Sequence, residues 1–218
     1  MKKSATVFAA IIGMGLCMFS GCSNGGTFTQ SNYSSGEAVI NNVILDVSDR
    51  EVEISVSSDN QIHIDYFESE KEYYTIIETD GTLKMTLDFD KEWTDFIGTK
   101  ADKEYRKIKL EIPDALLKNL SVTTTNERIK VTELEVNESI SLNSNGGGVE
   151  FEKLSAGEKI SLTAKNAGIT GSVVGGWDDY TIKVTIKKGN SNLADKDGGE
   201  KLLIVDCNNG DINIDLIK

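Results

Sequence analysis

Apolar and polar residues alternate along most of this chain with the period of two that is typical of β-strands. Between residues 38 and 112 the alternation occurs in short runs separated by polar breaks. The break Thr79-Asp80-Gly81 is typical of a tight hairpin, because glycine readily adopts the positive φ of such a turn. The runs are Val52-Ile54-Val56, Ile62-Ile64-Tyr66, Tyr74-Ile76, Leu83-Met85-Leu87 and Ile108-Leu110-Ile112. We predict an antiparallel strand meander over residues 38–112.

The alternation over residues 113–218 also repeats at long range. Val122, Leu142 and Leu162 are spaced 20 residues apart, and another apolar residue follows each of them after seven residues. A fixed period of this length is typical of stacked units. One unit of two short strands cannot bury its apolar side chains, but units stacked about 4.8 Å apart line them into internal columns.

The predicted fold is therefore all-β. It consists of a parallel β-solenoid-like stack of units of about 20 residues over residues 113–218, preceded by the meander. We assign both parts to a single β-repeat domain over residues 38–218.

The pattern of the N-terminal segment indicates that the protein is exported across the membrane. Lys2 and Lys3 precede an uncharged apolar run that ends in Phe19-Ser20-Gly21-Cys22. Such a run is short for a transmembrane helix, which needs about 20 apolar residues, but it is typical of a secretory signal. Its end is similar to the lipobox of bacterial lipoproteins, in which a lipid is attached to the cysteine, although Phe19 stands where leucine is usual.

We interpret residues 1–21 as a signal peptide and Cys22 as the lipidated residue. Ordinary cleavage, with Cys22 as a thiol, is the alternative. Residues 22–37 are rich in Gly, Ser, Asn and Thr, which predicts a flexible tether after the lipidated cysteine. The expected location is extracytoplasmic, with the protein anchored to the membrane of the cell envelope by the lipid on Cys22.

Charge and cysteine content narrow the possible partners. The formal net charge is −12, and loss of residues 1–21 removes two lysines and no acid, which lowers it to −14. This charge opposes binding to nucleic acid. If Cys17 leaves with the signal and Cys22 is lipidated, only Cys207 remains, so no intramolecular disulfide is expected. Cys207 alternates with Leu203 and Val205, which predicts a small buried side chain.

Several motifs occur in an order that resembles a known family. They are Ile112-Pro113-Asp114-Ala115-Leu116, Leu120-Ser121-Val122-Thr123-Thr124-Thr125-Asn126, Gly171-Ser172-Val173 and Asn208-Asn209-Gly210-Asp211-Ile212-Asn213-Ile214. Over residues 40–217 this set resembles the bacterial "putative adhesin" family, a β-strand-repeat domain of unknown function with lipoprotein members. The resemblance implies an extracytoplasmic all-β scaffold without established enzymatic activity. Asn126-Glu127 stands where the family usually has asparagine-glycine.

The sequence offers few of the residues from which catalytic and metal sites are built. His63 is the only histidine, so neither a histidine metal site nor a Ser-His-Asp triad is expected. Glu150 and Glu152 share an outward face and could form an acid/base pair, but Lys130 lies one unit away, which favours a surface ion pair. The acidic segment Asp206–Asp211 fails the spacing of a calcium-binding EF-hand and is interpreted as a turn. We predict no enzyme activity, no metal and no cofactor.

Two features are candidates for binding. Trp93 and Trp177 lie in predicted loops beside acidic residues, among them Asp178 and Asp179, an arrangement that can hold a glycan or an envelope protein. Alternatively, the tryptophans cover the ends of the stack. The second feature is a set of polar residues at equivalent positions of successive units, which can form outer ladders for a linear polymer or a plain solvated surface. They are Ser121, Ser141, Ser161, Thr123, Asn143 and Thr163.

We therefore hypothesise a non-enzymatic, adhesin-like binding module of the cell envelope. One alternative is an envelope-stress sensor or regulatory partner of a membrane protein. Another is a polysaccharide-acting β-helix enzyme, which would need a groove with facing carboxylates and a basic residue.

Overall fold

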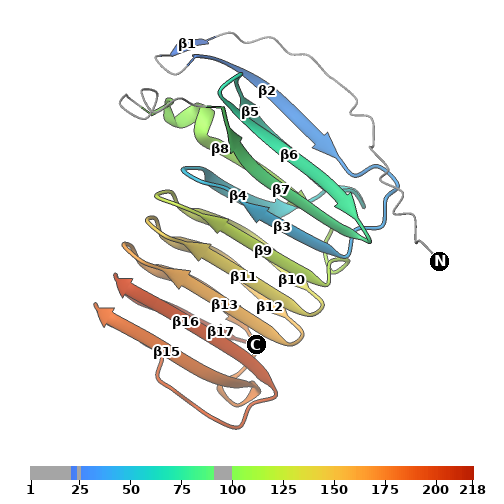
Figure 1. Ribbon diagram of the computed structural model, residues 1–218. Coiled ribbons are helices and arrows are strands. Elements are labelled where there is room, and N and C mark those ends of the chain that lie inside the picture. The colour runs from blue at the N-terminus through green and yellow to red at the C-terminus, as the bar shows by residue number, and fades with distance from the viewer. Residues whose placement is uncertain (1–20, 24–25, 91–99) are drawn as a thin grey trace, which may run out of the picture.

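The computed structural model describes residues 21–23, 26–90 and 100–218. Two sheets pack against each other along the whole length of the stack, as Figure 1 shows. Among the described residues, helix is confined to two short turns, η2 (Lys103–Arg106) and η3 (Trp177–Asp179). The predicted all-β class is confirmed.

The first sheet has eight strands. In spatial order they are β15 (Tyr180–Lys188), β16 (Lys201–Asn209), β13 (Lys159–Ala164), β11 (Ser139–Ser144), β9 (Asn119–Thr124), β3 (Asn42–Asp46), β7 (Thr82–Phe89) and β6 (Glu72–Thr79). All neighbours in it pair in parallel except β6 and β7, which form the hairpin predicted at Thr79-Asp80-Gly81.

The second sheet has nine strands. In spatial order they are β1 (Gly21–Ser23), β2 (Gly26–Ser34), β5 (His63–Glu68), β8 (Lys107–Ile112), β4 (Glu51–Val56), β10 (Ile129–Val136), β12 (Val149–Ala156), β14 (Ile169–Val174) and β17 (Ile212–Ile217). Pairing is parallel from β8 to β17 and antiparallel from β1 to β8.

The predicted column of aliphatic side chains lies between the two sheets. Leu142 is in register with Val122 on one side and with Leu162 on the other. The column continues to Leu45 at one end and to Val205 at the other, and all five side chains are at most 1% exposed. Burial of this continuous file stabilises the stack, since each such side chain contributes about 1.5–3 kcal/mol when removed from water.

The stack begins earlier in the chain than the sequence pattern indicates. β3 and β4 form a coil that pairs in parallel with β9 and β10. The first half is therefore less uniformly antiparallel than its alternation predicts. Val43 and Val52 lie nine residues apart, as Leu120 and Ile129 do. The spacing within the coil is thus retained, but a long insertion separates this coil from the next one and hides the period.

Residues 26–34 differ from the expected flexible tether, because they form β2. Tyr33 points into the core, while Phe28, on the other side of the strand, stacks on Tyr105 with ring centroids 5.1 Å apart. The backbone of Cys22 pairs with Thr27 in β1. The two aromatic anchors lie on opposite faces of β2, so they produce no alternation that the sequence could reveal.

A loop closes the C-terminal end of the stack. The amide of Asn192 donates to the carbonyl of Ile214 (3.0 Å), and the side-chain oxygen of Asn192 accepts from the backbone N–H of Ile214 (3.0 Å). Leu193 covers the core beside these bonds. The side chain of Asn192 thereby makes with β17 the hydrogen bonds that a further strand of the sheet would make. The described residues include no helix with the length and apolarity that crossing a bilayer requires.

Candidate functional site

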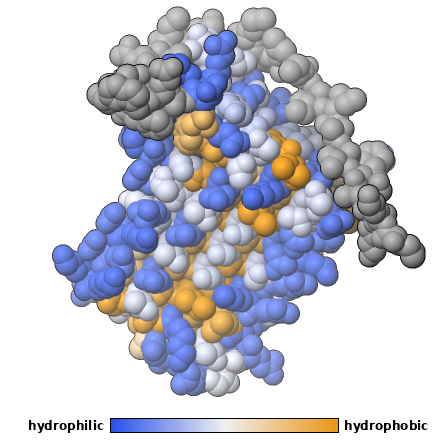
Figure 2. Space-filling view, in the orientation of Figure 1, coloured by the Kyte–Doolittle hydropathy of each residue, from blue (hydrophilic) through white to orange (hydrophobic). Residues whose placement is uncertain are grey.

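The outer faces of the two sheets differ in charge. On the eight-stranded sheet, eight of the nine outward side chains of three central strands carry hydroxyls or amides, and we call these eight residues the hydroxyl-amide face. They are Asn119, Ser121 and Thr123 on β9, Ser139, Ser141 and Asn143 on β11, and Ser161 and Thr163 on β13. The ninth is the exposed Lys159 of β13. Figure 2 shows white and orange residues running along the middle of this view, with blue residues gathered at both margins.

Regular pairing makes the hydroxyl-amide face a set of straight rows. Ser121, Ser141 and Ser161 are in register on adjacent strands, with Ile44 and Ile204 as the next residues at the two ends of the row. Adjacent members are therefore about 4.8 Å apart. No side-chain hydrogen bond engages the three serine hydroxyls within the described part of the chain, so their hydrogen-bonding capacity faces solvent.

The second row of the hydroxyl-amide face contains an unsatisfied acceptor. Asn143 lies between Thr123 and Thr163, and its Oδ1 is buried without a hydrogen-bond partner among the described residues. Such an orphaned acceptor costs stability. Asp46 and Asp206 end this row on either side and mark the rim of the face.

The outer face of the nine-stranded sheet contains an open groove of about 620 Å³. We call it the charged groove. Its sides are formed by outward residues of five strands, and its floor by Ile54, Val131 and Phe151. The side residues are Glu53, Ser55, Lys109, Glu111, Lys130, Thr132, Glu150, Glu152 and Thr170.

The groove lies where two strands change their alternation. β10 has two successive exposed residues at Thr132-Glu133, and β12 has an exposed and a half-buried residue at Glu152-Lys153. The pairing of β12 with β14 also shifts between Glu150 and Leu154. This irregularity re-aims the side chains beyond it. Val131 and Phe151, just before the altered alternation, are 4% and 5% exposed, whereas most of the core is at 0–2%.

Charges alternate in sign along one side of the groove. Lys109, Glu53, Lys130 and Glu150 follow one another on adjacent strands, an arrangement that stabilises a sheet face. Two of the acids also have partners at the margin. Glu53 lies 3.3 Å from Lys107 Nζ, and Glu150 lies 3.9 Å from an Arg128 nitrogen.

Four other groups in the groove have no such partner. Lys109, Lys130, Glu111 and Glu152 form no ion pair within 4 Å among the residues that the structure describes. The groove therefore presents two free ammonium groups and two free carboxylates to a ligand.

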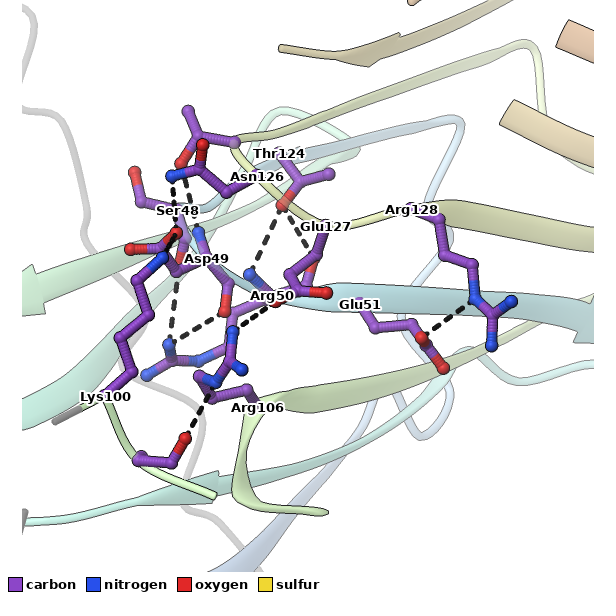
Figure 3. Close-up of polar contacts among 12 residues, drawn as sticks. Ser48, Asp49, Arg50, Glu51, Lys100, Arg106, Thr124, Asn126, Glu127 and Arg128 are labelled. Carbon is purple, nitrogen blue, oxygen red and sulfur yellow. Dashed lines mark hydrogen bonds and ion pairs between the residues drawn. The ribbon is translucent and has the colours of Figure 1, made fainter. Parts of the chain in front are cut away.

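All three arginines of the chain gather near the turns between β3 and β4 and between β9 and β10, as Figure 3 shows. Arg50 is buried; it forms an ion pair with Glu72, and its Nε donates to the Tyr74 hydroxyl (2.7 Å). Arg106 donates from Nε to the carbonyl of Ala101 (2.9 Å) and pairs with Glu127. The Arg50 bonds hold β6 against this corner, and the Arg106 bonds hold the segment that precedes β8.

Asp49 lies at the same corner with a positive φ of 54°. Its carboxylate accepts from Lys100 Nζ (2.8 Å) and Asn126 Nδ2 (2.7 Å). Burial alone would raise the pKa of Asp49, but the hydrogen bonds from Lys100 and Asn126 and the positive charges nearby outweigh it and lower the pKa. The charged groups described at this corner pair with one another. We therefore interpret the corner as a stabilising feature and not as a binding site.

The residues singled out for binding do not meet in one site. Trp177 is 45% exposed in η3, between β14 and β15. Asp178 Oδ1 lies 3.7 Å from Lys196 Nζ, and Asp179 accepts from the backbone N–H of Gly176 (2.6 Å), so Asp179 caps the turn. Trp93 lies outside the described residues. A binding role for these four residues stays a prediction.

Two further predictions concern single residues. Cys207 is fully buried, as predicted, and burial together with the nearby Asp206 and Asp211 raises the pKa of its thiol. His63 is half-buried on the outer side of β5, with Nε2 3.0 Å from Asp59 Oδ1. Nowhere in residues 21–23, 26–90 and 100–218 do three or more His, Cys, Asp or Glu side chains gather as metal ligands would.

Sequence reasoning found only part of the charged groove. The shared outward face of Glu150, Glu152 and the neighbouring Lys130 was expected from the period of the repeat. Lys109 and Glu111 were missed, because an antiparallel meander does not place β8 beside β4. β4 (Glu51–Val56) and β8 (Lys107–Ile112) have the same length and the same alternation. This match is the sequence signal that could have predicted their pairing.

The fold thus defines an all-β repeat protein of the solenoid-like type. Residues 40–218 match the model of the Toastrack DUF4097 family, and the chain belongs to this family. This agrees with the resemblance to "putative adhesin" proteins seen in the motifs.

One solved structure shares the fold, and others are similar over most of the chain with lower scores. A "putative cell adhesion protein" from Clostridium sporogenes has a TM-score of 0.60 at 12% identity, covering 87% of this chain and 100% of that chain. A "putative adhesin" from Bacteroides fragilis has a TM-score of 0.35 at 11% identity, covering 87% and 97%. A "putative adhesin" from Parabacteroides merdae has a TM-score of 0.31 at 18% identity, covering 89% and 98%. The search of curated proteins finds no match.

Proposed function

We propose that this protein is a non-enzymatic, adhesin-like binding module of the cell envelope, and that the hydroxyl-amide face holds an uncharged glycan strand. The observation that carries the proposal is the row of Ser121, Ser141 and Ser161, in register and without other side-chain hydrogen bonds in the described structure. Evenly spaced donors and acceptors suit a polymer whose hydroxyls also recur at even spacing. The fold likeness to a protein named for cell adhesion is in keeping with this role.

Charge favours a neutral glycan over an acidic one. The chain carries a net charge of −12, which repels polyanions. The eight residues of the hydroxyl-amide face carry no charge, so an uncharged strand would meet charges only at the rim, where Lys159, Asp46 and Asp206 lie. Ile44 and Ile204, at the ends of the serine row, can pack against the C–H groups of sugar rings.

Lipid on Cys22 would tether the stack to the membrane by its N-terminal end. Cys22 lies beside β2 at one edge of the nine-stranded sheet. A lipid at this position would hold the N-terminal end of the stack near the bilayer and leave the outer faces of both sheets open to the envelope.

The geometry of the carboxylates argues against a glycosidase. The two groove carboxylates without an ion-pair partner in the described structure, Glu111 and Glu152, lie three strands apart, about 14 Å by the usual strand spacing. Glu53 is closer to Glu111 but is paired with Lys107. The paired carboxylates of glycosidases are about 5–9.5 Å apart. Glu150 and Glu152 are closer along β12, but Glu150 is half exposed and near Arg128, whereas an acid catalyst is typically desolvated.

A binding assay with immobilised polysaccharides tests the proposal. The full-length chain in detergent is passed over neutral glucans and mannans and over a sulfated glucan of similar length. We expect retention on a neutral polymer only. The variant Ser141→Glu, which puts a charge at the centre of the row, should weaken retention at least about tenfold.

The matched control is Glu135→Gln, on the opposite sheet, which should bind as the unmodified chain does. Circular dichroism and melting curves show that each variant is folded. Equal retention on the sulfated polymer, or unchanged binding by Ser141→Glu, would refute the proposal.

A further inference from the structure

The charged groove is a second surface whose chemistry differs from that of the hydroxyl-amide face. We propose that the charged groove binds a short extended peptide that carries both an ammonium group and a carboxylate. This inference does not depend on the proposed glycan role, since the groove lies on the other sheet and shares no residue with that face.

The length of the groove suits a peptide of about six residues. Its lining residues come from β8, β4, β10, β12 and β14, which are consecutive in the sheet. Four strand spacings of about 4.8 Å give a length of about 19 Å. An extended chain advances about 3.3 Å per residue, so about six residues span the groove. The volume of about 620 Å³ falls within the range usual for ligand sites.

The four charges of the groove that are unpaired in the described structure favour a ligand that carries both a positive and a negative charge. Lys109 and Lys130 lie in one row with two acids that already have partners at the margin. Glu111 and Glu152 lie in the next row. A ligand with positive charges alone would meet the two lysines, and one with negative charges alone would meet the two glutamates. Each would therefore bring like charges together, which specific sites avoid.

The floor and the neutral side residues suit a peptide backbone with a small apolar side chain. Val131 and Phe151 belong to the core but also line the groove and are 4% and 5% exposed, so they can give a small apolar contact. Ser55, Thr132 and Thr170 have hydroxyls that can bond to peptide amides and carbonyls. None of the three makes a side-chain hydrogen bond within the described structure. A peptide offers amide donors and carbonyl acceptors to these hydroxyls between its two charged side chains.

The charge pattern of the peptide is tested by affinity. The probe is a library of end-blocked hexapeptides with one lysine, one glutamate and randomised Ala, Val and Leu between them. Two matched libraries replace the lysine or the glutamate by glutamine. Binding to the full-length chain in detergent is measured by calorimetry. We expect the doubly charged library to bind at least about tenfold more tightly than either singly charged library.

Variants locate the site. Lys130→Gln and Glu152→Gln should each weaken binding of the best peptide at least about fivefold, because each removes one of the unpaired charges. Glu135→Gln on the same strand as Lys130, and Lys159→Gln on the other sheet, are matched controls that should leave binding unchanged. The ring signals of Phe151 should shift in NMR spectra when the peptide is added.

Three results would overturn the inference. They are equal binding of the singly and doubly charged libraries, unchanged binding by both groove variants, and no binding by any library at a concentration of about 1 mM. Retention on neutral polysaccharides by Lys130→Gln and Glu152→Gln is measured in parallel. The glycan role and the peptide site can therefore fail separately.

Discussion

Gly171 lies directly against the ring of Phe151, so that a Cβ on Gly171 would stand 2.3 Å from Phe151 Cδ2. It would also stand 2.2 Å from the carbonyl oxygen of Phe151. No real Cβ approaches other atoms this closely, so any larger residue forces the ring or the backbone to move. The ring of Phe151 therefore occupies space that the missing side chain of Gly171 leaves free.

Gly171→Ala is expected to destabilise the protein by about 1–3 kcal/mol, the usual cost of overpacking. Because Phe151 forms part of the floor of the charged groove, the variant should also weaken peptide binding. Urea denaturation measures the stability. Thr170→Ala, an exposed change one residue away, is the control and should stay within about 0.5 kcal/mol of the parent chain. Equal stability of the two variants would contradict the close contact.

Leu142→Asp tests the central column. Leu142 is 1% exposed between Val122 and Leu162, so an aspartate there would be an unpaired buried charge. We expect a loss of at least about 3 kcal/mol, seen as a large drop in the urea midpoint. The adjacent outward variant Ser141→Asp should lose far less. A midpoint for Leu142→Asp close to that of Ser141→Asp would mean that position 142 does not face the core.

The column was predictable because three copies of one pattern follow each other without interruption. Val122, Leu142 and Leu162 sit at equal spacing, and parallel in-register stacking is the simplest way to bury all of them. The coil of β3 and β4 has the same internal spacing but no copy beside it in the sequence. Its membership of the stack depends on tertiary pairing, which a local pattern does not encode.

The two proposed binding surfaces differ in how far the sequence predicts them. The hydroxyl-amide face follows from the repeat alone, because the polar residues between the column residues recur with it, as Ser121, Ser141 and Ser161 do. The charged groove combines β10 and β12 with β4 and β8 from the first half. Its shape also depends on the irregular pairing after Glu150, which the residue pattern marks only as a three-residue step from Phe151 to Leu154 in place of the usual two.

Acid should weaken the corner around Asp49. The pKa of Asp49 is lower in the folded chain than the value of about 3.9 for an unfolded one. The ionised carboxylate therefore contributes stability above pH of about 4, and this contribution is lost as the pH falls through the folded pKa. Asp49→Asn should lower the melting temperature at pH 7 and leave a smaller difference from the parent chain at pH 3. Asparagine tolerates the positive φ at this position, so the backbone need not change.

The control for this experiment is Asp80→Asn, which has a similar positive φ in the hairpin between β6 and β7. Its difference in melting temperature from the parent chain should be small at both pH values. If the Asp49→Asn difference were as large at pH 3 as at pH 7, the bonds from Lys100 and Asn126 would not depend on the charge of Asp49.

Cys22→Ala tests the proposed lipid anchor. The apolar run before Cys22 ends in Phe19-Ser20-Gly21, so export and lipid transfer are expected to act at this position. Without the sulfur no lipid can be attached, and the chain should move from the membrane fraction to the soluble fraction. Cys207→Ala is the matched control, since it removes a buried thiol and should leave the distribution unchanged. Membrane association of Cys22→Ala equal to that of the control would refute lipid anchoring.

Asn143→Thr should stabilise the protein, which is uncommon for a single substitution. The change removes the buried Oδ1 that has no partner in the described structure, and it continues the threonine row between Thr123 and Thr163. Threonine is also favoured over asparagine in strands. The gain should be about 1 kcal/mol by urea denaturation, the usual cost of an unsatisfied buried acceptor. Asn119→Thr is the contrasting variant, because Asn119 Nδ2 donates to Asn42 Oδ1 (2.9 Å) and Glu138 Oε2 (3.0 Å), and loss of these bonds should destabilise. If both variants lost stability, the side chain of Asn143 would make a stabilising contact, and the premise of an unsatisfied acceptor would be wrong.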